Sequence, residues 1–225
     1  MNNTYNSYID REKSWLTFNA RVLQEANDAN VPLLDRFRFL GIFSNNLDEF
    51  FRVRYAAIRR MSLESAESEK ILGVKAEQLL KEITEIVIEQ QSESLRILNE
   101  IEKKLELENI FIINEKDISK EQEKFIHDYF IQKVSPALVT IMLNDLEEFP
   151  LLKDTSGYLA VKLVMNGSEI FNNKAKEIRY AVVEIPNTIN RFVVLPSNSE
   201  KQYIILLDDV IRYNLNNIFN IFDYE

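Results

Sequence analysis

Apolar residues recur three or four positions apart through the first half of the chain, which is the spacing of an amphipathic helix. Three stretches show this spacing: residues 10–27, 33–62 and 74–108. Pro32 ends the first stretch, and an acidic, serine-bearing loop at 64–69 follows the second. We expect the three stretches to form an antiparallel three-helix bundle, with a free coiled coil as the alternative.

Asp10 is the expected cap of the first helix, since aspartate accepts hydrogen bonds from the first free backbone N–H groups. The core positions that the periodicity selects on this helix are Trp15, Phe18, Val22, Leu23 and Ala26. Those on the long third helix are Leu79, Ile83, Ile86, Val87, Gln90, Leu98, Ile101 and Leu105. Both stripes place apolar side chains where a bundle buries them.

The second stretch carries a polar interruption, Ser44-Asn45-Asn46, within an otherwise apolar helix face. Short polar side chains compete with the backbone for hydrogen bonds and favour helix starts and turns. Asn46 followed three positions later by Glu49 has the spacing of a capping pair, so we expect a second helix to begin there. The arginines around the interruption are Arg36, Arg38, Arg52, Arg54, Arg59 and Arg60.

This arginine cluster has two interpretations. A helix start ringed by arginines would bind phosphate. A helical hairpin with a solvated arginine face is the simpler alternative, which the residues alone favour. Residues 31–61 hold six arginines and three acids, a local charge of +3, in a chain of formal net charge −9. That balance argues against nucleic acid as a partner and favours a small anionic ligand.

The pattern changes near Asn109. The run Ile110–Ile113 predicts a buried strand, and Ser119 with Gln122 forms a capping box that starts a helix, which Ser135-Pro136 ends. Four β-rich runs follow, at residues 158–165, 178–185, 192–195 and 203–206. Asp208 is the expected cap of a last helix.

The predicted fold class is therefore α+β, an N-terminal antiparallel three-helix bundle followed by an α+β domain with a mostly antiparallel sheet. We place the domains at residues 1–108 and 109–225. Hydrophobic residues make up 46% of the chain, which is enough for a packed core.

Several kinds of chemistry are excluded by composition. The chain has no cysteine, which rules out disulfides and thiolate sites, and a single histidine, His127, argues against zinc. The four glycines lie too far apart for a glycine-rich phosphate loop. The adjacent acids Asp208 and Asp209 are typical of a helix start. The residues alone assign no catalytic and no metal-binding position.

The first residues are polar and form no apolar signal segment, and no run of about 18 apolar residues exists that could span a membrane. The absence of cysteine fits a reducing compartment. We expect a cytoplasmic location, with a peripheral place at the membrane as an open alternative.

Two long stretches resemble the opening signatures of bacterial polyphosphate kinase, the type that uses a histidine phosphoenzyme. They read YIDREKSWLTFNARVLQEA at residues 8–26 and PLLDRFRFLGIFSNNLDEFFRVR at residues 32–54. Shorter pieces at residues 158–161, 180–186, 191–196 and 204–211 also resemble this family. The resemblance covers essentially the whole chain, and its visible departure is a long loop at 166–177.

The resemblance implies a reversible transfer of the terminal phosphate of ATP to a histidine and then to polyphosphate. It implies that the N-terminal helical domain covers one side of the nucleotide and that the second asparagine of the Ser-Asn-Asn-Leu-Asp motif, here Asn46, contacts ATP. ATP and Mg²⁺ would serve the complete enzyme, with neither bound tightly by this chain alone. The head (middle) domain would serve subunit association in a homo-oligomer.

In this family the phosphorylated histidine and the metal site lie in C-terminal domains that would follow residue 225, and His127 corresponds to neither. We therefore expect an N-terminal portion of the enzyme with a truncated head domain. Such a portion should make no polyphosphate by itself and should self-associate or be only marginally soluble. The alternative is a stand-alone, non-catalytic binding or assembly module with the same fold.

Overall fold

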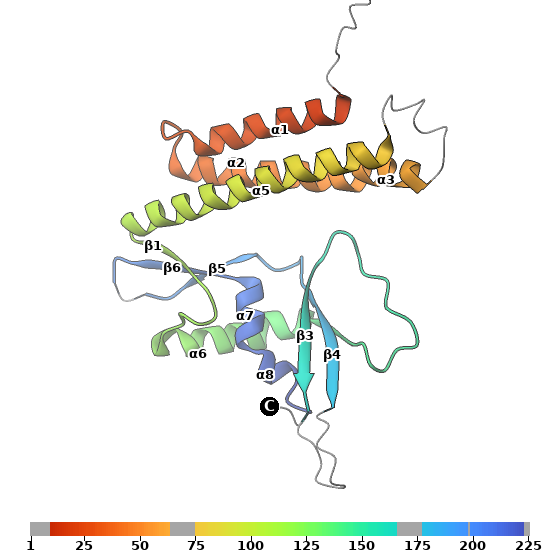
Figure 1. The fold of residues 1–225 in the computed structure, drawn as a ribbon. Coiled ribbons are helices and arrows are strands. Elements are labelled where there is room, and N and C mark those ends of the chain that lie inside the picture. The colour runs from red at the N-terminus through yellow and green to blue at the C-terminus, as the bar shows by residue number, and fades with distance from the viewer. Residues whose placement is uncertain (1–9, 64–74, 166–176, 198, 223–225) are drawn as a thin grey trace, which may run out of the picture. The chain divides into compact units, whose positions relative to one another are not determined.

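The computed structural model describes residues 10–63, 75–165, 177–197 and 199–222 (Figure 1). The loop expected at 64–69 lies outside these residues, as does nearly all of the long loop at 166–177. Two compact units make up the chain, unit 1 (Met1–Glu108) and unit 2 (Asn109–Glu225).

Unit 1 is an all-helical bundle. Its elements are α1 (Arg11–Asn27), α2 (Leu33–Glu49), the π-helical segment η1 (Phe50–Tyr55), α3 (Ala56–Leu63) and α5 (Ala76–Leu107). The helices α1, α2 and α5 run in alternating directions and pack against one another, which confirms the antiparallel bundle (Figure 1). Asp10 caps α1 as expected, because its side chain accepts from the backbone N–H groups of Glu12 and Lys13.

The core of unit 1 corrects the predicted stripe on α1. Leu16, Leu23 and Ala26 are buried there, whereas Phe18 is 50% exposed. Apolarity alone selected Phe18, but the helix must face both α2 and α5, and that requirement turns the ring outward. Its face is covered instead by the guanidinium of Arg21, 5.5 Å from the ring centroid.

The stripe on α5 is largely confirmed, although it omitted Ala76 and Ile97, both of which are buried. Leu79, Ile83, Val87, Gln90, Ile101 and Leu105 are buried as expected. Ile97, which was not predicted, is fully buried, while Ile86 and Leu98 are only partly covered.

The predicted helix start at Asn46 is wrong. The helix α2 continues through Ser44-Asn45-Asn46 to Glu49, so Asn46 lies in its interior. Regular α-helical geometry changes only at η1, where the chain adopts π-helical turns before α3. The side chain of Asn46 bonds to Asn19 of α1 and not to its own backbone, which removes the competition that would have broken the helix.

Unit 2 is α+β, as predicted. Its helical elements are α6 (Lys120–Tyr129), η2 (Phe130–Val134), η3 (Ser135–Ala137), α7 (Leu207–Tyr213) and α8 (Leu215–Ile218). Its strands are β1 (Ile110–Ile113), β2 (Val139–Met142), β3 (Gly157–Val164), β4 (Ile178–Ile185), β5 (Phe192–Leu195) and β6 (Gln202–Leu206).

These strands form two three-stranded sheets and not one, in the orders β1-β6-β5 and β2-β4-β3. All pairings are antiparallel except the parallel pair of β1 with β6, so the sheet structure is mostly antiparallel, as expected. The strand β2 was not predicted, and β1 is half-buried and not fully buried.

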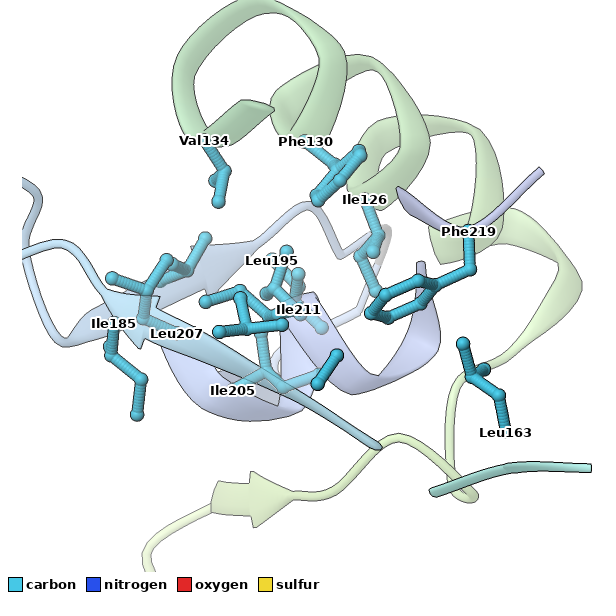
Figure 2. Close-up of a cluster of buried hydrophobic side chains, with 14 residues drawn as sticks. Ile126, Phe130, Val134, Leu163, Ile185, Leu195, Ile205, Leu207, Ile211 and Phe219 are labelled. Carbon is cyan, nitrogen blue, oxygen red and sulfur yellow. The ribbon is translucent and has the colours of Figure 1, made fainter. Parts of the chain in front are cut away.

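An apolar cluster forms the core of the described part of unit 2 (Figure 2). Ile126 and Phe130 from the α6–η2 helix meet Ile205 of β6 and Ile211 of α7, all at most 2% exposed. The capping box of Ser119 at the start of α6 is confirmed. The cap expected at Asp208 is wrong, because α7 begins at Leu207 directly after β6 and places Asp208 in its first turn.

Candidate functional site

Two asparagines join α1 to α2 inside unit 1. Asn19 on α1 is fully buried and donates from Nδ2 to the backbone oxygen of Phe43, 3.2 Å away. Asn46 on α2 donates from Nδ2 to Oδ1 of Asn19 at 3.0 Å and is itself half-buried. Both ends of the Asn19 amide are therefore bonded, which compensates the burial of this polar group. Asn46, the expected ATP contact, is held at the outer end of the pair.

An aromatic pair lies one helical turn away along the same contact. The rings of Trp15 and Phe50 stack with centroids 5.0 Å apart and an interplanar angle of 24°. Trp15 precedes Asn19 by four residues and Phe50 follows Asn46 by four, so the aromatic and asparagine pairs are successive layers of the α1–α2 contact. Phe50 also begins η1, and π-helical turns of this kind often occur at functional sites.

The next layer is a buried carboxylate. Glu12 is 5% exposed and lies between Arg54 of η1, with Nη1 2.9 Å from Oε2, and Arg11, with Nη2 2.6 Å from Oε1. Burial alone would raise the pKa of Glu12, but the hydrogen bonds and charges of Arg11 and Arg54 together lower that pKa below its usual value. The Arg54 guanidinium also covers the ring of Trp15, 5.8 Å from its centroid.

The aromatic pair and the Glu12 layer line a cavity of about 330 Å³ between α1, η1 and α3, whereas Asn19 and Asn46 lie outside its lining. Phe50, Ile58 and Met61 give it an aromatic and aliphatic wall, while Glu49 and Arg54 give it charged groups of both signs. A small organic group with a flat apolar face and a polar edge suits a cavity of this size and lining.

The arginine cluster does not form the phosphate-binding corner that was one of its two interpretations. The helix start on which the corner depended is absent, since α2 continues through Asn46. Four of the six arginines pair with carboxylates of the chain itself: Arg36 with Glu100, Arg38 with Asp35, Arg52 with Asp48 and Arg54 with Glu12. Only Arg59 and Arg60, on α3, have no ion pair within the described residues.

Other candidate groups are not assembled into a site. His127 is exposed on α6, with Nδ1 3.5 Å from Nδ2 of Asn217. No cluster of three or more histidine or acidic side chains that could hold a metal ion occurs among the described residues.

The sequence carried a signal for Glu12 and Asn19 that we did not use. Glu12, Leu16, Asn19, Leu23 and Ala26 are spaced four, three, four and three apart, and all five are buried on α1. Two polar residues on such an inward stripe must find partners inside the bundle, and here the partners are Arg54 and Asn46.

Comparison with known proteins identifies the family. The family model described as "Polyphosphate kinase N-terminal domain" matches residues 8–113, and that described as "Polyphosphate kinase middle domain" matches residues 121–225. The chain belongs to the polyphosphate kinase family. It is 40% identical over 225 residues to the polyphosphate kinase of Escherichia coli strain K12, and 38% identical over 231 residues to that of Vibrio vulnificus strain YJ016.

A solved structure of a polyphosphate kinase shares this fold. The crystal structure of the enzyme from Porphyromonas gingivalis superposes with a TM-score of 0.82 at 28% identity, over 98% of this chain and 32% of that one. Each of the two sequence matches covers 97% of this chain, which spans 30–31% of the length of those polyphosphate kinases. No helix in the described part of the chain is long and apolar enough to cross a membrane.

Proposed function

We propose that this chain serves an enzyme that reversibly transfers the terminal phosphate of ATP to polyphosphate, and that unit 1 forms one side of the ATP site through Asn46. The names of the relatives support the reaction. The observation that carries the role of Asn46 is its geometry: a half-buried amide, oriented by a fully buried partner, one turn from a cavity with an aromatic wall.

The described residues suit binding and positioning but not the chemical step. Phosphoryl transfer needs a positioned nucleophile and several cationic groups or metal ions around the phosphates. Most of the arginines near Asn46 are already paired with carboxylates of the chain. The described residues offer no acidic cluster that fits Mg²⁺, so we assign no metal ligand to this chain. We therefore propose that the chain alone is inactive.

Unit 2 is the proposed subunit-association module of a homo-oligomer. Within the described residues its two sheets end in strands β1, β5, β2 and β3, each of which pairs with a neighbour on one side only. Val194 on β5 is 64% exposed and Val139 on β2 is 49% exposed. Exposed apolar side chains at sheet edges are a common basis for association between chains. We propose a cytoplasmic place for the enzyme, where its substrate ATP is supplied.

The test is polyphosphate synthesis from ATP and Mg²⁺, measured on the full-length gene product and, separately, on this chain of 225 residues. We expect synthesis by the former and none by the latter. Absence of synthesis by the full-length gene product would favour the stand-alone binding or assembly module. If the chain alone synthesised polyphosphate and His127→Ala abolished that synthesis, our assignment of no catalytic residue to this chain would be wrong.

A further inference from the structure

The orientation of the Asn46 amide is determined by a backbone atom three residues before it. The carbonyl oxygen of Phe43 can only accept a hydrogen bond, so the group of Asn19 that faces it must be the Nδ2 amide. The other end of the Asn19 side chain, Oδ1, is then an acceptor that faces Asn46. Asn46 must meet this acceptor with its own nitrogen, and the observed contact of 3.0 Å is of that kind.

The oxygen of the Asn46 amide is left for a ligand. Its nitrogen lies against the Oδ1 of Asn19, which belongs to a fully buried side chain. Its own Oδ1 accepts no hydrogen bond from the described residues and is not among their buried unpaired polar atoms. Since Asn46 is half-exposed, this oxygen is an acceptor that the residue can offer to a ligand, beside the second N–H of its Nδ2.

We infer that Asn46 accepts a hydrogen bond from the nucleoside part of ATP, either from a ribose hydroxyl or from the amino group of adenine, and that Asn19 is the positioning residue that enforces this polarity. The inference rests on the proposed function, in which Asn46 contacts ATP. A contact made through the Asn46 oxygen cannot be with phosphate, because phosphate oxygens at neutral pH are acceptors and repel a carbonyl oxygen. Hydroxyl and amino groups are the donors that ATP carries, and both belong to its nucleoside part.

The test is a set of thermodynamic cycles between enzyme and substrate. We would measure kcat/KM for polyphosphate synthesis by the full-length gene product, with Asn46 intact and as Asn46→Ala. The substrates are ATP, 2′-deoxy-ATP, 3′-deoxy-ATP and purine riboside triphosphate, which lacks the amino group. Each analogue removes one donor, and the cycle isolates the interaction of that donor with Asn46.

We expect Asn46→Ala to lower kcat/KM for ATP by about 3- to 10-fold, the usual value of one neutral hydrogen bond. For the one analogue that lacks the contacted donor, Asn46→Ala should have no further effect. An equal loss for ATP and for all three analogues would overturn the inference while leaving the ATP contact in place. No loss for ATP itself would overturn the proposed contact and the inference together.

Asn19→Ala tests the positioning role. Without Asn19 the amide of Asn46 is free to turn, so we expect KM for ATP to rise with kcat unchanged. We also expect the preference for ATP, which is the ratio of kcat/KM for ATP to kcat/KM for the analogue that lacks the contacted donor, to fall toward one. A purely structural role for Asn19 would lower thermal stability and leave that preference intact, which would contradict the inference. If Asn19→Ala does not fold, the cycles on Asn46 decide alone.

Discussion

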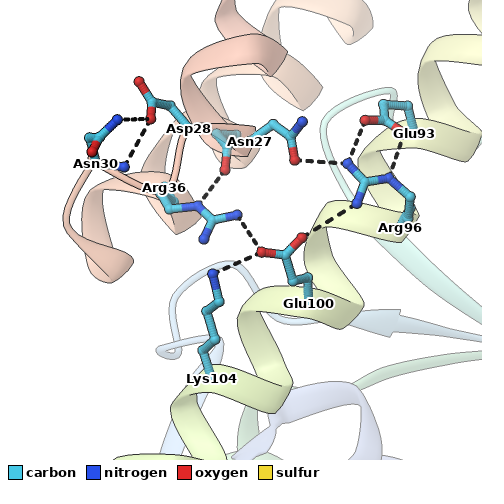
Figure 3. A network of polar contacts seen from close by, with 9 residues as sticks. Asn27, Asp28, Asn30, Arg36, Glu93, Arg96, Glu100 and Lys104 are labelled. Carbon is cyan, nitrogen blue, oxygen red and sulfur yellow. Dashed lines mark hydrogen bonds and ion pairs between the residues drawn. The ribbon is translucent and has the colours of Figure 1, made fainter.

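Arg36 joins two helix ends inside unit 1, and its replacement gives a stability prediction that can be worked out contact by contact. Its side chain is almost fully buried, with 1% of the residue exposed. Nε donates to the backbone oxygen of Ala26, at the end of α1, at 2.7 Å, and Nη2 lies 3.2 Å from Oε1 of Glu100 on α5 (Figure 3). Within the described residues, no other donor reaches the Ala26 oxygen.

Arg36→Met keeps most of the aliphatic stem and removes the guanidinium. The hydrogen bond from a charged donor to the buried oxygen of Ala26 is worth about 1.5–3 kcal/mol. The ion pair with Glu100, whose side chain is 37% exposed, adds about 0–1 kcal/mol after screening by solvent. We therefore expect Arg36→Met to lower the free energy of unfolding of unit 1 by about 2–4 kcal/mol.

Urea unfolding followed by tryptophan fluorescence measures this loss, because Trp15 is the only tryptophan and stacks on Phe50 inside unit 1. The matched control is Arg38→Met, which removes an exposed arginine paired with Asp35 and should cost less than about 1 kcal/mol. Equal urea midpoints for Arg36→Met and Arg38→Met would refute the claim that the contacts of Arg36 with α1 and α5 stabilise unit 1.

Three further predictions concern pH and association. The hydrogen bond from Lys104 and the other cations nearby lower the pKa of Glu100 to about 2, so unit 1 should lose stability as the pH falls from about 4.5 toward 2. Glu100→Gln should reduce this dependence of stability on pH, measured by urea unfolding followed by tryptophan fluorescence at several pH values. An unchanged dependence would show that Glu100 does not cause it. Burial, helped by the charge of Asp208, raises the pKa of Asp209 to about 6, so unit 2 should lose stability as the pH rises from about 4 through 6. Asp209→Asn should remove this loss of stability, measured by hydrogen exchange of β6–α7 peptides and corrected for the pH dependence of the intrinsic exchange rates. A loss of the same size in the variant would show that the Asp209 carboxyl is not its cause. Light scattering should give a molecular mass for the chain that grows with concentration, owing to exposed apolar edge residues such as Val194, whereas a monomer mass at every concentration would count against association.

Local signals predicted two of the helix starts correctly, whereas those expected at Asn46 and Asp208 are wrong. Asp10 and the Ser119 capping box act within three residues of their own positions, so no knowledge of the fold was needed to place them. The long helix α5 likewise follows from its own apolar period. The strand β2 was missed because its four residues carry little pattern, and its pairing with β4 joins residues about 40 positions apart.

The wrong predictions near the candidate site have one cause, which is that polar side chains of α1 pair with those of α2 and η1. Ser44-Asn45-Asn46 looks like a helix break until Asn19, 27 residues earlier, supplies the partner for Asn46. Arg54 looks solvated until Glu12 is placed opposite it. A single sequence shows that polar residues occupy inward positions, but which of them meet depends on the packing of α1 on α2. The expectation that Asn46 contacts ATP rested on the resemblance to polyphosphate kinase and not on the spacing of residues.

The central claim is that Asn46 contacts ATP, and one pair of substitutions tests it most directly. Asn45→Ala is the matched control, because Asn45 is the adjacent residue of the same helix and is exposed. Both variants of the full-length gene product would be assayed for kcat/KM with ATP, at a temperature where tryptophan fluorescence shows unit 1 to be folded. Loss of a partner for the buried Asn19 should also cost Asn46→Ala about 1–3 kcal/mol of stability, so this check is needed. We predict that Asn46→Ala lowers kcat/KM by at least about 3-fold and that Asn45→Ala leaves it unchanged. Equal values for the two folded variants would contradict the account.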